Sequence, residues 1–224
     1  MDNKQIIQWN IQQSKKNIKK NILKDRIIIF FTRIVEDLGK YKNPNFYGRL
    51  KELFLSIYPY FDFKDTKQIY DHFKKLNFKS REGLLLDKEE IDYVKFFINN
   101  LDSNCKIKDR NKVEPKIKEM LSLLVKKYLP NSSVLIEPYL LGKIISSVGG
   151  IKNLYRKPSS TIQLIGAERA MFRHISKKKP SPKYGLIYYS GKIQNAKDKG
   201  KTSRRLANKL ILGIRIDYFQ MFAQ

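Results

Sequence analysis

Cysteine and histidine are nearly absent from this sequence. Cys105 is the single cysteine, and His72 and His174 are the two histidines. One cysteine cannot form an intramolecular disulfide, and these three residues cannot supply a zinc site of the usual Cys/His type. The shortage fits a reducing compartment, and we expect neither a metal nor a cofactor.

Long apolar runs and catalytic motifs are also missing. No apolar run approaches the roughly 20 residues that a helix needs to span a bilayer, and the start, MDNKQIIQWN, lacks the apolar core of a signal peptide. We find no glycine-rich phosphate loop and no paired acids at catalytic spacing. His174 stands among cations without a nucleophile or carboxylate beside it, which favours a structural role. The sequence therefore predicts an intracellular, soluble protein that is not an enzyme.

Acidic residues are scarce relative to basic ones. Lys and Arg number 46 against 21 Asp and Glu, a formal net charge of +25. Residues 136–224 hold eighteen of the bases and only four of the acids. Such an excess makes the folded chain repel itself, and a polyanion such as nucleic acid relieves that repulsion by releasing its counterions. The alternatives are a lysine-rich composition without a partner, or a helical protein–protein adaptor with an acidic partner.

The spacing of apolar residues predicts an all-α fold. Residues 6–37 contain no proline or glycine, repeat apolar residues at helical spacing, and are followed by Gly39 as an expected C-cap. We expect further helices over 45–58, 66–76 and 87–101, and another with Pro115 in its first turn. Long helices with short breaks are typical of an antiparallel helical coiled-coil arm, which we assign to 1–129.

A second domain is expected over 130–224. Gly149 and Gly150 close a short apolar helix, Ser159 and Ser160 are expected caps, and a helix follows Gly166 as far as about Ile175. The last helix is expected over about 202–222. It should bury Leu206, Leu210, Ile214 and Ile211 and turn Arg204, Arg205, Lys209 and Arg215 outward.

Three elements of this domain offer cations to one ligand. Arg169 and Arg173 are four residues apart and so share a helix face, which suits phosphate contacts. Taken alone, this pair is better read as a solvated basic face. The basic loop 177–183 and the last helix reverse that preference, because a phosphate-reading surface draws cations from several elements. Tyr184, Tyr188 and Tyr189 flank the loop and suit base stacking, although core packing is expected for at least two of them.

Short motifs in a fixed order resemble the Nop domain, the RNA-binding module of box C/D ribonucleoprotein core proteins. They are Pro130-Asn131, Gly149-Gly150, the run PSSTIQ at 158–163, GAER at 166–169 and AMFR at 170–173, followed by PKYGLIYYSGKIQ and GKTSRRLANKLILGIRIDYF. Upstream, KKNIKKNILKDRIIIFFTRIVEDL and RLKELFLSIYPYF are more weakly similar to the coiled-coil region of the family, which mediates self-association.

The resemblance implies a compact helical domain that clamps a kink-turn RNA jointly with a small ribosomal-type kink-turn-binding protein. The family presents guide RNA to fibrillarin for 2′-O-methylation of rRNA or tRNA. Carried over by motif, the RNA-binding residues are Arg156, Lys157, Arg169, Arg173, Lys183, Lys201, Arg204 and Lys209. The signature residues Gly166, Ala167 and Glu168 are expected to touch RNA or the partner protein. The implied location is cytoplasmic in an archaeon and nucleolar in a eukaryote.

Two departures from the family pattern limit the carry-over. Arg169 stands where lysine is usual, which keeps the charge and adds a bidentate donor. Members of the archaeal type also carry an N-terminal fibrillarin-binding domain, whereas the arm expected here begins almost at Met1. Either that domain is encoded as a separate subunit that connects this chain to fibrillarin, or it has been lost, or fibrillarin is not a direct partner. The runner-up is a spliceosomal U4-type kink-turn clamp, a relative without that domain.

Overall fold

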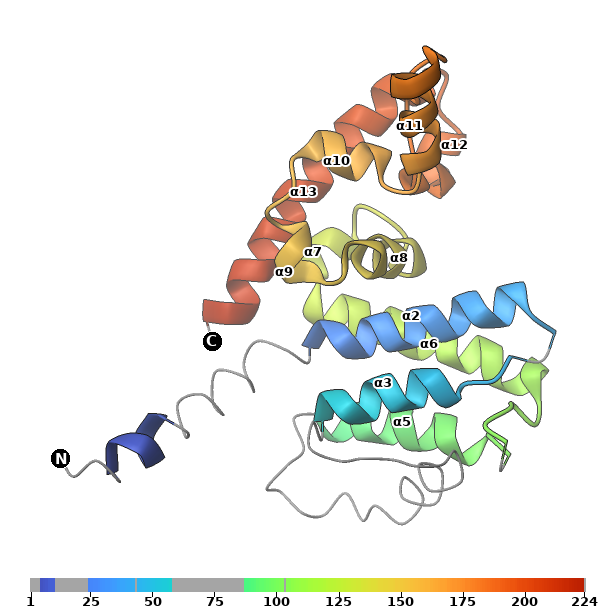
Figure 1. Cartoon of the computed structure of the whole chain (residues 1–224), viewed down its shortest axis with the longest axis vertical. Helices are drawn as coiled ribbons and strands as arrows, with labels where there is room; N and C mark the ends of the chain where they lie inside the picture. Colours follow the sequence, from blue (N-terminus) through green and yellow to red (C-terminus); the bar gives the residue numbers. More distant parts are fainter. Residues whose placement is uncertain (1–4, 11–23, 43, 58–86, 103, 224) are drawn as a thin grey trace. The chain divides into compact units, whose positions relative to one another are not determined.

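The computed structural model describes residues 5–10, 24–42, 44–57, 87–102 and 104–223. Its contacts divide the chain into two compact units, Met1–Ile117 and Lys118–Gln224. Within the described residues the secondary structure is helical, apart from one isolated antiparallel bridge between Leu101 and Ile107 (Figure 1). The predicted all-α fold is therefore confirmed. The predicted division at 129/130 concerns function and stays a prediction.

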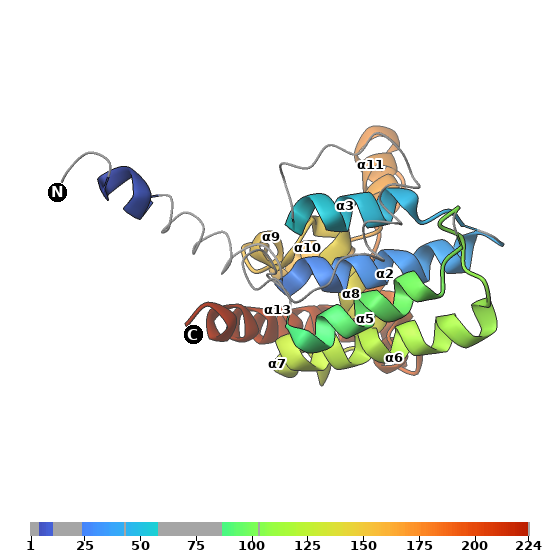
Figure 2. The same ribbon diagram turned by 90° about the horizontal axis from the view of Figure 1, so that it is seen from below.

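The first unit is a bundle of antiparallel helices. It contains α2 (Lys24–Lys40), α3 (Tyr47–Ile57), α5 (Lys88–Asn99) and the start of α6 (Arg110–Tyr128), which lie side by side (Figures 1 and 2). Phenylalanine rings join α2, α5 and the residue just before α3, because the ring of Phe97 packs edge-on against Phe30 and Phe46 at 5.7 and 5.4 Å. Such edge-to-face pairs stabilise a core beyond the area they bury.

Several predicted boundaries in this unit differ from the structure. Helix α2 continues through Gly39 to Lys40, so Gly39 is not its C-cap. Pro115 lies inside α6 rather than in its first turn, since the helix begins five residues earlier at Arg110. The side chain of Arg110 bonds to Glu114 at 3.1 Å, which supports that added turn. The helix predicted over 66–76 lies outside the described residues. Residues 11–23 of the stretch predicted as helical from residue 6 also lie outside them.

The predicted start of α5 is confirmed with its cap. The backbone N–H of Asp87 donates to Glu90 Oε2 at 2.9 Å, which is one half of a capping box. Glu89 and Glu90 lie in the first turn, where a carboxylate is favoured by the helix dipole.

The second unit is built around one long helix, α13 (Lys199–Ala223). Short helices pack along it, among them α7 (Pro130–Ser133), α9 (Ile151–Leu154), α10 (Ser159–Leu164) and α12 (Gly191–Gln194) (Figure 1). The remaining helices are α8 (Pro138–Val148), α11 (Glu168–Lys177) and the 3₁₀ turn η1 (Leu186–Tyr189). As predicted, α13 buries Leu206, Leu210, Ile211 and Ile214.

A buried carboxylate ties the start of this unit to its last helix. Asp217 is 1% exposed, and its two oxygens accept four hydrogen bonds from Asn131 and Ser132. Two of the donors are the backbone N–H groups at the start of α7, and the shortest bond joins Ser132 Oγ to Asp217 Oδ2 at 2.6 Å. The Pro-Asn motif at 130–131 therefore has a structural reason, because a carboxylate from α13 caps α7.

Two glycines allow the signature turn at 165–167 to touch the loop at 185–186. Gly166 has a φ of 87°, and a Cβ at this position would lie 2.5 Å from Leu186 Cγ. A Cβ at Gly185 would lie 2.0 Å from the carbonyl oxygen of Ile165. The backbone N–H of Leu186 donates to that same oxygen at 2.6 Å. Glycine is therefore required at both positions, because a side chain at 166 or 185 would collide with the facing segment.

Other local predictions in this unit are partly right. Gly149 ends α8 in the left-handed region with a φ of 81°, as expected. Ser159 and Ser160 do not cap α10; Pro158 holds the N-cap position and no side-chain cap bond forms there. Helix α11 runs two residues past Ile175 to Lys177, and its C-cap Lys178 has a φ of 51°. None of the helices in the described ranges is long and apolar enough to cross a membrane.

Candidate nucleic-acid interface

A hollow of about 540 Å³ opens between α8, α9, α10 and the start of α11. It gathers three of the residues that the sequence singled out, the cations Arg156 and Lys157 and the signature acid Glu168. Its full lining is Ser147, Val148, Asn153, Arg156, Lys157, Thr161, Ile165 and Glu168. Residues 147–168 run from the end of α8 through α9 and α10 to the start of α11, and the turns between these helices bring the lining side chains to one place.

A second hollow, of about 640 Å³, lies against α11 and shares Glu168 with the first. Its other lining residues are Arg169, Phe172 and Arg173. Helix α11 buries none of its residues, and Phe172 and Ile175 are 70% and 73% exposed. This helix therefore presents arginines and bare apolar side chains together, which is the composition of a contact surface rather than of a solvated helix.

The cations of these two hollows form no ion pair with the carboxylates that the structure describes. Within the described residues no ion pair forms at Arg156, Lys157, Arg169 or Arg173. The carboxylate of Glu168 instead accepts a hydrogen bond from the backbone N–H of Gly166 at 2.7 Å. Arginines without carboxylate partners retain their donors for a ligand, and phosphate is the anion that matches a guanidinium fork.

The other four predicted RNA-binding residues lie elsewhere in the unit. Lys183 is near the start of α13, since a Cβ at Gly200 would lie 3.5 Å from its Cδ. Lys201, Arg204 and Lys209 are exposed along α13 itself, as predicted for Arg204 and Lys209; Lys201 joins them because the helix begins at Lys199, before the predicted start near 202. The structure therefore divides the predicted set of eight into two groups, one around the hollows and one along the first half of α13.

The tyrosines that flank the basic loop have two different environments. Tyr184 and Tyr188 stack on each other at 4.7 Å with an interplanar angle of 15°, and both are half-buried. Tyr189 is 65% exposed. The expectation that at least two of the three pack in the protein is confirmed. His174 Nδ1 bonds to the carbonyl oxygen of Lys179, which closes the basic loop onto α11 and fits the structural role expected for it.

A pair of tyrosines escaped the sequence analysis. Tyr155, just after α9, and Tyr218, on α13, stack at 3.9 Å with an interplanar angle of 13°. Arg156 Nε donates to the phenol oxygen of Tyr155 at 3.1 Å. This hydrogen bond lowers the pKa of Tyr155 and raises that of Arg156. A single tyrosine at 155 carries no signal in the sequence, because its partner lies 63 positions away and no periodicity connects them.

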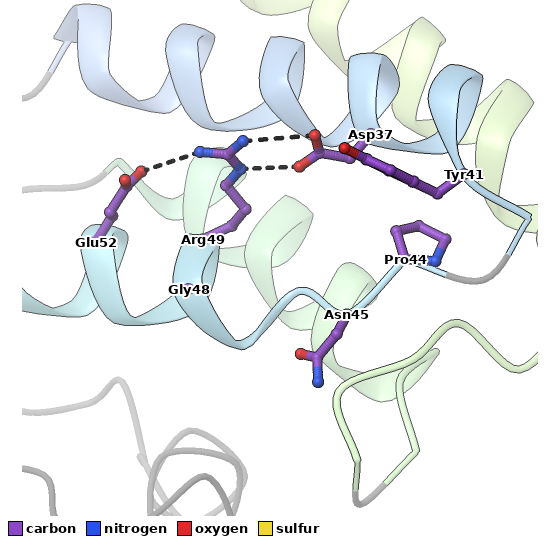
Figure 3. A pocket seen from close by; sticks show the side chains of 7 residues that line it. All are labelled: Asp37, Tyr41, Pro44, Asn45, Gly48, Arg49 and Glu52. Carbon is purple, nitrogen blue, oxygen red and sulfur yellow. Dashed lines mark hydrogen bonds and ion pairs between the residues drawn. The ribbon is translucent and has the colours of Figure 1, made fainter.

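A third hollow, of about 480 Å³, lies in the first unit between α2 and α3 (Figure 3). Here Arg49 Nε donates to Asp37 Oδ2 at 2.9 Å, and Arg49 Nη1 lies 3.7 Å from Glu52 Oε2. The hydrogen bond to Asp37 raises the pKa of Arg49 above its usual value. Since Arg33 also bonds to Glu52 at 2.8 Å, the charges of this hollow balance one another and leave little attraction for a charged ligand.

Known proteins resemble part of this chain. Nucleolar protein 56 of Saccharomyces cerevisiae is 47% identical over 92 residues, which is 40% of this chain and 18% of that protein. Nucleolar protein 58 of Neurospora crassa is 31% identical over 144 residues, which is 63% of this chain and 23% of that protein. The chain thus spans about a fifth of the length of these relatives.

A solved structure and a family model complete the comparison. The structure, titled as a fibrillarin/Nop5p complex, aligns with a TM-score of 0.48 and 18% identity over 97% of this chain and 71% of that chain. The family model Nop, described as "snoRNA binding domain, fibrillarin", matches residues 28–223. That match covers nearly all of α2 through α13, including both hollows of the second unit, and so this chain belongs to the Nop family.

Proposed function

We propose that this protein is a non-catalytic RNA-binding scaffold that grips a kink-turn RNA through residues 130–224. The observation that carries the proposal is the set of arginines and lysines around the two adjoining hollows, which no described carboxylate neutralises. Membership of the Nop family supports RNA as the anion. Arg156, Lys157, Arg169 and Arg173 would hold phosphates at the hollows, and Lys183, Lys201, Arg204 and Lys209 would extend the contact along α13.

The proposal includes a small ribosomal-type kink-turn-binding protein on the same surface. Helix α11 supports it, because Phe172 and Ile175 remain exposed beside Arg169 and Arg173. A partner that covers the apolar side chains while the arginines reach phosphates would use both features of one helix. Gly166, Ala167 and Glu168 precede the helix and would lie at the edge of that contact.

The wider task follows from the relatives. Two of the proteins most similar to this chain are named nucleolar proteins 56 and 58, and the aligned structure is named for fibrillarin. We infer a box C/D guide particle in which this chain supports fibrillarin-catalysed 2′-O-methylation. In a eukaryotic cell the location would be the nucleolus. The arm would also allow two chains to associate.

The test is the salt dependence of RNA affinity. The full chain is titrated against a kink-turn hairpin, with and without its kink-turn-binding protein, at several salt concentrations. Each phosphate contact contributes a slope of about −0.9 in log affinity against log salt on duplex nucleic acid. We expect a steep slope for the unmodified protein and a slope smaller by about one contact for Arg173→Gln.

The matched control is Arg26→Gln, which removes the same charge from an exposed position in the first turn of α2. It should leave the slope and the affinity of the full chain unchanged. A flat salt response of the unmodified protein would overturn the proposal in favour of a protein–protein adaptor. A pull-down with fibrillarin, repeated after addition of an N-terminal fragment of a relative, separates a box C/D scaffold from a U4-type clamp.

A further inference from the structure

An aromatic cluster stands beside the first hollow, where α9 meets the second half of α13 (Figure 1). Tyr155 and Tyr218 form its stacked base, and Phe219 packs against both rings at 70° and 77°. The base is fixed from a second direction, because Arg215 Nε donates to the carbonyl oxygen of Tyr155 at 3.2 Å. The cluster is therefore a rigid platform rather than a set of loose side chains.

The stacked tyrosines connect α9 to α13, and this structural role explains why both are there. It does not explain the presence of Phe219. That ring is 61% exposed although it lies next to two half-buried rings that hold it in place. The neighbouring Leu212 and Ile216 are also exposed, at 58% and 48%, on the same side of α13 at helical spacing. A braced aromatic ring that remains open offers a flat surface to a ligand without loss of side-chain freedom on binding.

The exposed charged residues next to the platform in α9, in α13 and just after α9 are positive. Arg156, Arg215 and Lys152 are exposed, and the charged groups that act on the Tyr155 hydroxyl are Arg156 and Lys152. The only acid in α13 is Asp217, which is buried and already accepts its four hydrogen bonds. Aromatic surface ringed by cations matches an unpaired nucleotide, whose base stacks while its phosphates meet the cations.

Arg156 connects this platform to the first hollow, since it lines that hollow and its guanidinium also lies 5.5 Å from the centre of the Tyr155 ring. We propose that the platform formed by Tyr155, Tyr218 and Phe219 stacks an unpaired nucleotide that extends from the RNA held at the hollow. This inference rests on the proposed function, because the hollow must hold RNA for a nucleotide to continue from it. The platform would add a site for single-stranded RNA to a surface that otherwise contacts phosphates.

The experiment measures the affinity of the full chain for two hairpins. Both contain the same kink-turn, one ends blunt and the other carries a short unpaired adenosine tail. Stacking on an aromatic side chain is worth about five- to hundredfold per base in alanine substitutions, so we expect the tail to strengthen binding by about tenfold. Phe219→Ala and Phe219→Leu should abolish this gain, Phe219→Tyr should keep it, and none of the three should change binding of the blunt hairpin.

Leu212→Ala is the matched control, because Leu212 is equally exposed on the same helix but has no ring. A tail that adds nothing for the unmodified protein, while the blunt hairpin binds, overturns the platform and leaves the proposed function standing. So does a gain that Phe219→Leu keeps and Leu212→Ala loses, which would mark an apolar protein-docking surface instead. Unchanged thermal unfolding verifies that each variant is folded.

The proposed function can fail separately. If the blunt hairpin does not bind, free oligoadenosine tests the platform alone, and loss of its binding in Phe219→Ala supports the site whereas equal binding overturns it. A photo-crosslink from a thiolated nucleotide in the tail gives a readout without any substitution. Trypsin cleaves after Lys152, Arg156 and Arg215, so we expect the adduct on the peptide 216–224 or, through Tyr155, on the peptide 153–156. An adduct confined to other peptides counts against the platform.

Discussion

The two units of this protein differ in whether the arginines around their hollows form ion pairs. In the hollow of the first unit, Arg49 bonds to Asp37 at 2.9 Å, and the lining residue Glu52 bonds to Arg33 at 2.8 Å. In the hollows of the second unit, Arg169 and Arg173 lie four residues apart on one helix without an ion pair to a described carboxylate. The charges of the first hollow balance one another, whereas the other two hollows carry an excess of positive charge.

The difference shows how net charge becomes informative. A formal charge of +25 shows only that binding a polyanion would relieve the self-repulsion of the folded chain. The structure separates arginines that hold helices together from arginines that remain open to a ligand, and a composition count treats the two alike. A hollow lined by paired charges is a structural feature, whereas one lined by unpaired cations costs stability unless an anion occupies it.

The largest expected effect comes from Asp217, where the second unit does use a carboxylate for structure. Asp217→Ala would leave the donors of Asn131 and Ser132 without their buried acceptor, at a cost of about 3 kcal/mol in the free energy of unfolding. Chemical denaturation measures that loss. Glu137→Gln is the comparison, because Glu137 is exposed and bonds to Gly191 N–H at 3.0 Å, and it should cost less than about 1 kcal/mol. Equal losses would show that the buried cap is not special.

The next largest effect is expected from a substitution that creates in the second unit an ion pair like those of the first. Arg173→Glu places a carboxylate four residues after Arg169, where the two can form an ion pair. We therefore expect it to remove two phosphate contacts, about 1.8 in salt slope, where Arg173→Gln removes about 0.9. The affinity for a kink-turn hairpin should fall by about tenfold more in the glutamate variant. Identical slopes for the two variants would mean that Arg169 contacts no phosphate.

Much of the helical framework could be predicted from the sequence, and the site only in part. The boundaries at Asp87 and Gly149 were predicted because a capping acid and a left-handed glycine act locally. The cap from Asp217 to Asn131 could not be, since it joins positions 86 residues apart. The same reason hid the Tyr155–Tyr218 stack. Ser159 and Ser160 show the opposite failure, in which residues of good capping type do not cap because Pro158 holds that position.

A smaller effect is expected when the paired hollow is opened. Arg49→Met removes the bond to Asp37 and keeps most of the apolar stem. Both partners are partly exposed, at 30% and 16% of their side chains, so solvent screening limits the loss to about 1 kcal/mol. Affinity for RNA should not change, because this arginine serves the bundle. A loss of RNA affinity at unchanged stability would break the contrast between the two units.

The smallest effect concerns Cys105, at the turn between α5 and α6. It tests whether water reaches the buried thiol in the first unit. The side chain is buried, and burial raises the pKa of the thiol to about 11 from an ordinary value of 9.0. Because the unfolded chain then loses this proton at a lower pH than the folded chain, stability falls as the pH rises above about 9. Each unit of pKa difference corresponds to about 1.36 kcal/mol, so the fall by pH 9.5 stays below about 1 kcal/mol.

Cys105→Ala isolates this contribution. The φ of 56° at this position strains an alanine, but that cost does not depend on pH. Lysines and tyrosines that titrate in the same range affect both proteins equally, so the difference between their stabilities reports the thiol. We expect the gap between the unmodified protein and Cys105→Ala to narrow as the pH rises from 8 to 9.5. A constant gap would mean that water reaches the thiol, and that the turn at Cys105 opens more readily than its packing indicates.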